Sequence, residues 1–363
     1  MNAAPVVNKK SQWLTFVASA VALAVLPLLV QNLGLAWVRI LDIALLYILL
    51  ALGLNIVVGF AGLLDLGYVA FYAVGAYLFA LLSSPHLSEH LPAVAAWFPQ
   101  GLHTPIWLAI PIGAGVAAIF GVLLGAPTLK LRGDYLAIVT LGFGEIIRVF
   151  LNNLEAPVNI TNGPKGIDRI DPLNAFGVSL GEPWHVMGLE LPPVTLHYYL
   201  FLGLVILGVV ISLRLNNSRL GRAWRAVRED EIAAKAMGLN TRNLKLLAFG
   251  LGATFGGVAG VLFASFQGFV SPESFSLHES IMLVAMVVLG GLGHVPGVIL
   301  GAFLLAALPE VLRHVAGPLQ AMTGGRLDAS ILRQLLIALA MIGIMLARPR
   351  GLWPAPEGQA TLK

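Results

Sequence analysis

The chain consists of long runs of apolar residues that are separated by short polar stretches. A helix needs about 20 apolar residues to cross a bilayer core about 30 Å thick. By this measure the sequence predicts one all-α polytopic membrane domain over residues 1–363, with about ten transmembrane helices. They are expected at 13–33, 40–60, 66–83, 105–129, 135–153, 196–213, 246–268, 279–293, 297–315 and 330–347.

The composition supports a membrane protein and excludes other classes. Apolar residues make up 58% of the chain and charged residues only 11%, whereas a soluble domain has about 25% charged residues. A soluble enzyme and a nucleic-acid-binding protein are therefore excluded. The chain has no cysteine, which rules out disulfides and thiolate metal sites. Without ligand spacing among its histidines or a Walker A motif, it is expected to bind no metal, ATP or other cofactor itself.

Basic residues gather in the loops that would lie on one side of ten alternating helices. The 214–245 loop carries eight Lys and Arg residues, while the 83–104 loop has none and the 154–195 loop is net acidic. Because Lys and Arg are enriched in cytoplasmic loops, we expect both termini and the 214–245 loop in the cytoplasm. The 154–195 loop is expected in the periplasm. The first apolar run is long enough to favour a retained helix over a cleaved signal.

Two apolar runs are broken by polar and glycine-rich stretches, at residues 59–67 and 271–278. Each break precedes a short apolar helix. Transporters often build the substrate path from interrupted helices at matching positions in two halves. The pattern therefore favours a two-half internal repeat, and packing without a path is the alternative. The candidates for the path or gate at these breaks are Asp65, Tyr68, Glu279 and Ser280.

Two charges lie inside the fifth predicted helix, where each would cost about 2.5–3.5 kcal/mol at the bilayer centre. Glu145 lies near the expected midplane, and Arg148 follows at i+3 on the same face. The pair either neutralises itself within the packed bundle or belongs to the gate or substrate path. The other acidic residues near apolar runs lie closer to predicted helix ends, where water can reach them: Asp42, Asp65, Glu279 and Glu310.

Small residues recur at four-residue spacing on three predicted helices, which lets helix backbones approach closely. The longest row is Gly252, Gly256 and Gly260, and shorter rows are Gly121 with Gly125 and Gly297 with Gly301. Packing within one subunit is the expected role, and a subunit interface is the alternative.

The 214–245 loop is rich in residues that favour helices. Asp230 can cap a short helix over 231–237, and Gly238 suits the left-handed conformation that ends one. Such a regular helix in an exposed loop suggests that a partner protein binds it. An amphipathic helix that lies on anionic lipid is the alternative.

Four stretches resemble, in order, the permeases of branched-chain amino acid ABC importers of the LivM type, and the resemblance covers nearly the whole chain. The stretches are Leu131–Glu145, Thr161–Ile167, Gly221–Asn240 and Val287–Gly297. The resemblance implies a permease subunit of the bacterial inner membrane that carries leucine, isoleucine and valine. It would work with a sister permease, two ATPase subunits that bind ATP, and a periplasmic substrate-binding protein. The long 154–195 loop and the N-terminal span depart from the commonest pattern.

The third stretch resembles the family's coupling loop, which docks on the ATPase, and we use that name for residues 214–245. The resemblance places the ATPase contact at Arg228, Asp230, Glu231, Ala234 and Gly238.

The sequence is also compatible with other substrates and with other classes of transporter. Permeases of this type also import urea, short amides or aromatic acids. A self-sufficient ion-coupled transporter using Glu145 or Asp65 is another hypothesis, and a membrane-embedded enzyme is disfavoured because the sequence has no cluster of catalytic residues.

Overall fold

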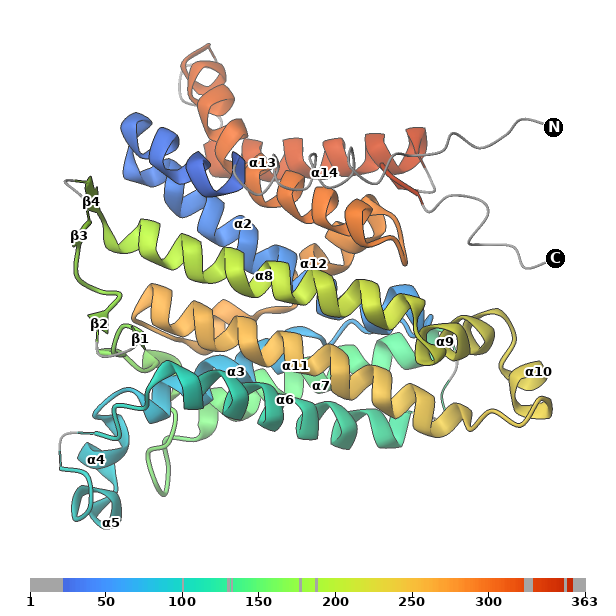
Figure 1. Cartoon of the computed structure of the whole chain (residues 1–363), viewed down its shortest axis with the longest axis horizontal. Coiled ribbons are helices and arrows are strands. Elements are labelled where there is room, and N and C mark those ends of the chain that lie inside the picture. Colours follow the sequence, from blue (N-terminus) through green and yellow to red (C-terminus); the bar gives the residue numbers. More distant parts are fainter. Residues whose placement is uncertain are drawn as a thin grey trace.

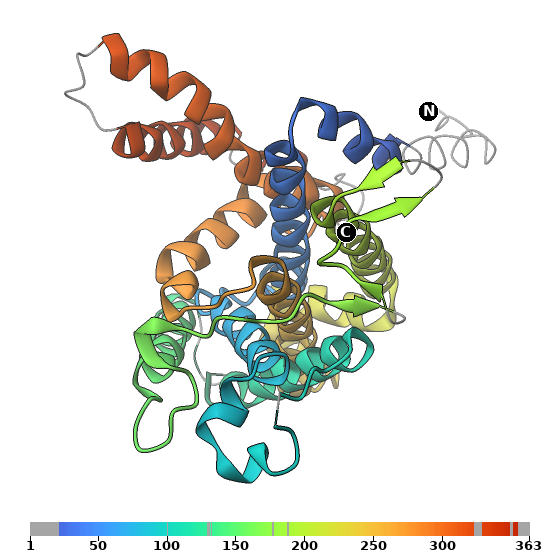
Figure 2. The ribbon, with the colours of Figure 1, turned by 90° about the vertical axis from the view of Figure 1, so that its left-hand side faces the viewer.

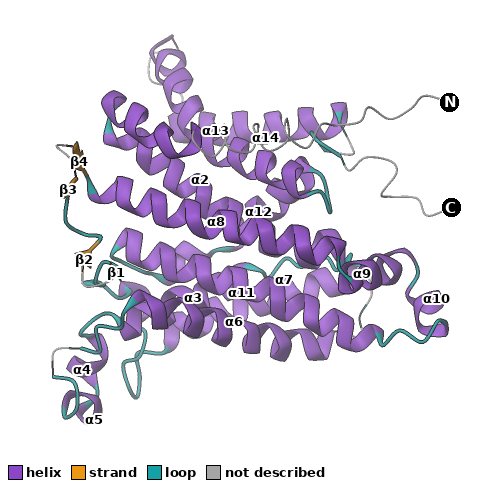
Figure 3. Ribbon diagram, viewed as in Figure 1, coloured by secondary structure: helices purple, strands orange, loops and turns teal. Residues whose placement is uncertain are grey.

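A computed structural model describes residues 22–99, 101–128, 131, 133–175, 178–186, 189–322, 329–348 and 351–354. Within these residues the chain is largely helical (Figures 1 and 3). The long helices are α2 (Leu35–Leu54), α3 (Val69–Leu82), α6 (Ile106–Thr128), α7 (Asp134–Asn153), α8 (Pro193–Asn217), α11 (Thr241–Gln267), α12 (Leu277–Gly290), α13 (Val295–Met322) and α14 (Ala329–Ala347). The shorter helices are η1 (Gln31–Leu33), α4 (His86–His90), α5 (Pro92–Ala95), η3 (Gly163–Lys165), α9 (Arg219–Glu229) and α10 (Glu231–Ala236).

The bundle is organised around α2 and α11, which are the most buried of its long apolar helices. α11 packs against α6, α3 and α2, while α2 also packs against α8 and α13. At one end of the long helices lie α4, α5 and the strands, and at the opposite end lie α9 and α10 (Figure 1). α13 and α14 project from one side of the bundle (Figure 2). The coupling loop therefore lies at the end opposite to the 154–195 loop, as the alternation of helices predicts.

Nine of the ten predicted spans coincide with helices; of the first, 13–33, the described part is residues 22–33, which is helical. Among the described residues, six helical segments are long and apolar enough to cross a membrane. They are Leu35–Phe60, Ile106–Thr128, Pro193–Asn217, Thr241–Gln267, Pro272–Gly290 and Val295–Leu312. α3 has only 14 residues, and α7 carries charged and amide side chains. The protein is thus an all-α membrane protein, whereas the count of ten spans and the internal repeat are not confirmed.

Both predicted breaks are irregular backbone between helices. α2 runs directly into a π-helix, η2 (Asn55–Phe60), and an irregular segment then leads to α3. Short π-helices are rare and frequently mark functional sites. After α11 the chain turns at Gly268, where φ is 67°, and the 3₁₀-helix η4 (Pro272–Phe275) leads into α12. Because η4 precedes α12, the eighth predicted span starts earlier than expected and gains length.

The 154–195 loop contains two small antiparallel hairpins. β1 (Asn174–Ala175) pairs with β2 (Val178–Ser179), and β3 (Trp184–Val186) pairs with β4 (Leu189–Leu191). An isolated bridge joins Ile167 to Val270 through two backbone hydrogen bonds of 2.8 and 3.0 Å. The loop is therefore tied to the segment that leads from α11 into the second break.

The glycine rows pack within the subunit, as expected. A Cβ added to Gly252 would lie 3.0 Å from the carbonyl oxygen of Gly53 on α2. One added to Gly260 would lie 2.3 Å from the carbonyl oxygen of Tyr72 on α3. Gly121 and Gly301 likewise face neighbouring helices of the same chain. Glycine is needed at these positions because a neighbouring segment occupies the space that a side chain would fill.

We expect Gly260→Leu to reduce the yield of folded protein severalfold, since overpacking commonly costs about 1–3 kcal/mol and more where a backbone cannot move. The matched control is Gly115→Leu on α6, because no atom lies within 4 Å of a Cβ there. The measurement is the monodisperse yield and thermal midpoint in detergent. Equal yields for both variants would contradict the packing role.

Candidate functional site

The first break is held tightly against α7. The Leu66 N–H donates to the Thr140 hydroxyl oxygen at 3.0 Å, and a Cβ on Gly67 would lie 2.0 Å from the Thr140 carbonyl oxygen. Asp65 accepts a bond of 2.9 Å from the Gly67 N–H, is 1% exposed, and lines a cavity of only about 10 Å³. Asp42 is also fully buried. The expectation that water reaches these two carboxyls is therefore wrong, because neighbouring segments cover them.

Tyr68 and Ser280 join the two breaks to each other and to α11. The first backbone N–H of α3, from Val69, donates to the Ser280 hydroxyl at 3.3 Å, and the Tyr68 hydroxyl donates to the carbonyl of Gly252 at 2.9 Å. Both side chains are buried. In this structure they brace the breaks and do not face an open space.

Glu279 lies beside Ser280 in the first turn of α12 and is only partly buried. Its Oε2 accepts a hydrogen bond of 2.8 Å from the hydroxyl of Tyr47 on α2. This tyrosine, for which the sequence pattern gave no signal, therefore fixes the orientation of the carboxylate.

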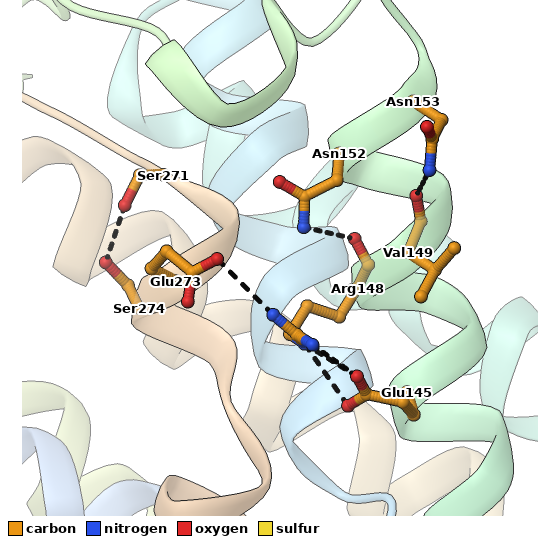
Figure 4. A network of polar contacts seen from close by, with 8 residues as sticks. All are labelled: Glu145, Arg148, Val149, Asn152, Asn153, Ser271, Glu273 and Ser274. Atoms are coloured by element: carbon orange, nitrogen blue, oxygen red, sulfur yellow. Dashed lines mark hydrogen bonds and ion pairs between the residues drawn. The ribbon is translucent and has the colours of Figure 1, made fainter.

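Glu145 and Arg148 form the expected ion pair, and the structure adds a third member. Arg148 Nε donates to both Glu145 carboxylate oxygens at 3.0 and 3.2 Å, and Arg148 Nη1 donates to Glu273 of η4 at 3.3 Å (Figure 4). The side chains remain 42%, 26% and 70% exposed for Glu145, Arg148 and Glu273. We call these three residues the ion cluster. It links α7 to the second break, about 17 Å along α7 from its first residue.

The coupling loop contains two helices, α9 and α10, and α10 coincides with the helix that the sequence predicted over 231–237. Asp230 caps α10, because its Oδ1 accepts from the N–H groups of Ile232 and Ala233 at 2.8 and 3.1 Å. Gly238 ends it with φ of 84°. The predicted helix is therefore confirmed, and α9, with Ser218 as its cap, is a further and longer helix that the prediction did not include.

Glu231 anchors α10 to the membrane-embedded part of the chain. Its Oε2 accepts from Lys245 Nζ on α11 at 2.8 Å, and its Oε1 accepts from the Thr241 hydroxyl at 3.3 Å. Burial raises the pKa of Glu231, but the hydrogen bond and charge of Lys245 outweigh it, so the pKa lies below its ordinary value. The carboxylate is therefore held ionised next to a lysine that is only 5% exposed.

The other expected contact residues differ in what they offer a partner. Ala234 is buried against the loop, whereas Asp230 and Gly238 are exposed. Two large apolar side chains of α10 and its end, Ile232 and Met237, are 67% and 83% exposed. These side chains are largely uncovered by the described segments of this chain and are available to another molecule.

Arg228, at the end of α9, reaches the first break. Its Nη1 donates to the carbonyl oxygen of Gly59 at 2.5 Å. A cavity of about 310 Å³ lies between the coupling loop and the break, lined by residues of 61–64, 131–136 and the loop, including Glu231 and Lys245. The structure thus brings the coupling-loop residues together with the first break, while the ion cluster lies on the second break.

No catalytic arrangement emerges from these groups. The described residues hold no cluster of His, Asp or Glu that could bind a metal ion. The described residues offer interrupted helices, charges on one helix face, and an exposed loop tied to a break. The fold and site define an all-α membrane protein with interrupted helices.

Comparison with known proteins places the chain in a family. A family model described as the permease component of the branched-chain amino acid transport system matches residues 36–345. The chain is 43% identical over 339 residues to the high-affinity branched-chain amino acid transport system permease protein LivM of Escherichia coli K12, covering 90% of this chain and 72% of the relative. The chain therefore belongs to the branched-chain amino acid transport permease family.

More distant relatives agree with this assignment. The probable branched-chain amino acid transport permease protein LivM of Methanocaldococcus jannaschii is 28% identical, over 85% of this chain and 90% of the relative. The high-affinity permease protein LivH of Escherichia coli K12 is 24% identical, over 86% of this chain and 92% of the relative. No solved structure matches the chain.

Proposed function

We propose that this chain is one of two unlike permease subunits of an ATP-driven importer for leucine, isoleucine and valine in the bacterial inner membrane. Family membership supports the substrate class. The observation that carries the ATP-driven mechanism is the coupling loop, which combines exposed apolar residues with a hydrogen bond to the first break. A chain without a Walker A motif needs partners to hydrolyse ATP. We propose two ATPase subunits on the coupling loop and a periplasmic binding protein at the opposite face.

The proposed sister permease is an unlike relative of this chain. The likeness to LivH, which is named as a permease protein of the same transport system as LivM, supports a pair of related subunits. The two would meet around a shared path, with membrane lipid covering their outer faces.

The ion cluster supports a position for that path. Three charged side chains that remain partly exposed in a helix and its neighbour would be costly against lipid tails, at about 2.5–3.5 kcal/mol each on insertion scales. They are stable if this face of α7 borders water or the sister permease. We therefore propose that α7, η4 and α12 line the path, with Glu145, Arg148, Glu273 and Glu279 on its wall and Asp65, Tyr68 and Ser280 bracing it from behind.

Neutralising the cluster tests this position. In Glu145→Gln with Arg148→Met, both charges go together, so no unpaired charge is left on α7. We expect leucine uptake to fall about tenfold, equivalent to about 1.4 kcal/mol on the barrier, with assembly retained. Asn153→Ala is the control, because that side chain donates to Val149 of its own helix at 2.7 Å. Normal uptake by the double variant would show that the Glu145–Arg148 pair serves packing and not the path.

The proposed topology has ten spans with both termini in the cytoplasm. It rests on the nine helices that coincide with predicted spans and on the basic coupling loop. Reporter fusions at Ser218 should read cytoplasmic, and fusions at Glu89 and Asp171 should read periplasmic. A periplasmic signal at Ser218 would overturn both the orientation and the ATPase contact.

Uptake by proteoliposomes that contain the complete complex tests the function itself. Labelled leucine should accumulate when ATP and loaded binding protein are present, and excess isoleucine or valine should compete. Urea, acetamide and aromatic acids should not compete. Uptake that continues with a catalytically dead ATPase, or that is driven by an ion gradient alone, would contradict the proposal.

A further inference from the structure

The first break meets the turn between α12 and α13 at the end of the bundle that carries the coupling loop. Asn55, the first residue of the π-helix, accepts through Oδ1 a hydrogen bond of 2.9 Å from the N–H of Gly293, just after α12. A Cβ on Gly59 would lie 2.0 Å from that same Oδ1 and 2.7 Å from the Gly293 nitrogen. Segments from opposite halves of the chain are therefore in direct contact at this point.

Arg228 lies on this contact. Its Nη1 donates to the Gly59 carbonyl, and the same Nη1 would lie 3.3 Å from a Cβ on Gly293. A Cβ on Gly62 would lie 2.5 Å from Arg228 Cγ. Gly62 and Gly293 both have positive φ, 71° and 79°. One side chain from the coupling loop thus fits against two glycines of the first break and one glycine of the α12–α13 turn.

The chemistry of the contact explains why an arginine suits it. Carbonyl groups in the last turn of a helix lack the partners that carbonyls inside a helix have. The guanidinium group carries five N–H donors in a rigid plane and stays charged. It can therefore hold a carbonyl at the end of the π-helix while its stem packs on the bare backbone of Gly62.

The coupling loop has a second attachment of a different kind. Glu231 holds the start of α10 to Lys245 in the first turns of α11. Arg228 holds the end of α9 to the first break and the α12–α13 turn, only three residues earlier. A force on α10 would therefore be shared between a continuous helix, which moves as a rigid body, and these two irregular segments, where the backbone can bend.

We propose that Arg228 is the positioning residue that transmits movement of the coupling loop to the first break and to the α12–α13 turn, through a contact that persists during the transport cycle. This inference rests on the proposed ATP-driven function. It assigns the transmission step to one side chain and three glycines, which we call the arginine clasp: Arg228, Gly59, Gly62 and Gly293.

The first test measures molecules of leucine transported per ATP hydrolysed in proteoliposomes. Arg228→Met keeps an unbranched apolar stem but loses the donors and the charge. We expect the ratio to fall about tenfold or more, with a normal yield of complex. The matched control is Arg222→Met on the same helix, whose guanidinium donates at 3.3 Å to the nearby Asn217 carbonyl. It should keep the parental ratio.

The second test replaces the clasp with a covalent link. A Cβ on Gly62 would lie 3.1 Å from Arg228 Cβ, so a small outward shift of the loop reaches the separation of about 3.5–4.5 Å found in disulfides. The chain has no cysteine of its own, so Gly62→Cys with Arg228→Cys gives a single pair. Reduced, this variant should behave like Arg228→Met. Oxidised, it should recover at least about half of the parental ratio, since the link again joins loop and break.

The possible outcomes distinguish a failure of the proposed Arg228 contact from a failure of the proposed transport function. If the parent complex shows no ATP-dependent leucine uptake, the proposed function fails. If the parent transports and Arg228→Met keeps the parental ratio, the clasp alone is wrong. If the oxidised disulfide variant still transports little leucine per ATP, or does not transport at all, the proposal of a persistent contact is also wrong.

Discussion

Glu231→Arg should uncouple transport from ATP hydrolysis. The change removes the carboxylate that pairs with Lys245 at 2.8 Å and places a second cation beside a lysine that is only 5% exposed. Breaking a buried pair by removing one partner commonly costs about 3–5 kcal/mol. It also puts a positive charge at the N-terminus of α10, where the helix dipole disfavours it. We expect α10 to detach from α11, and uptake to fall at least about tenfold.

A charge swap and a neighbouring substitution make this prediction specific. Glu231→Arg combined with Lys245→Glu restores opposite charges and should recover part of the lost uptake. Glu229→Arg introduces the same charge change two residues away, at an exposed position on α9, and should have a small effect. The measurement is uptake together with the ATPase rate stimulated by loaded binding protein. Equal losses in Glu229→Arg and Glu231→Arg would show that surface charge, and not the ion pair, matters.

Gly238→Val should have a comparable effect for a different reason. Gly238 has φ of 84°, and it closes α10 with hydrogen bonds from its own N–H to the Lys235 carbonyl and from the Leu239 N–H to the Ala234 carbonyl. No atom lies within 4 Å of a Cβ at this position, so valine would cause no clash. Its cost is backbone strain of about 1–3 kcal/mol, which would unwind the end of α10.

Asparagine separates strain from any other effect of a side chain at this position. Asn tolerates positive φ far better than β-branched residues do, so Gly238→Asn should keep most of the transport activity. Uptake and stimulated ATPase rate are compared for the two variants at equal amounts of complex. If both variants transport at the parental rate, the shape of this end of α10 does not matter for coupling, and the lipid-surface alternative gains support.

The sequence predicted those features that depend on neighbouring residues. Apolar runs located nine of the helices, Asp230 was identified as a cap, and Gly238 as a helix end, because each is a local pattern. The spacing of Glu145 and Arg148 predicted their ion pair for the same reason.

The sequence did not predict features that depend on which helices become neighbours. Glu273 joins the ion cluster from 125 positions away, and Arg228 meets Gly59 across 169 positions. Asp42 was expected near water, yet the bundle covers it completely. The π-helix after α2 has no periodic signal of its own, and the pairing of Glu231 with Lys245 crosses a turn whose path the pattern does not specify.

The exposed side chain of Met237 offers the most direct test of the central claim, that ATPase subunits act on this permease through the coupling loop. In Met237→Cys, the thiol takes a position that is 83% exposed in the lone chain. The account predicts that maleimide labels it from the cytoplasmic side in the permease alone, and that assembly with the ATPases blocks labelling. Glu182→Cys, exposed in the 154–195 loop, should label from the opposite side with or without the ATPases. Labelling of Met237→Cys that is unchanged by assembly, or that comes from the periplasmic side, would contradict the account.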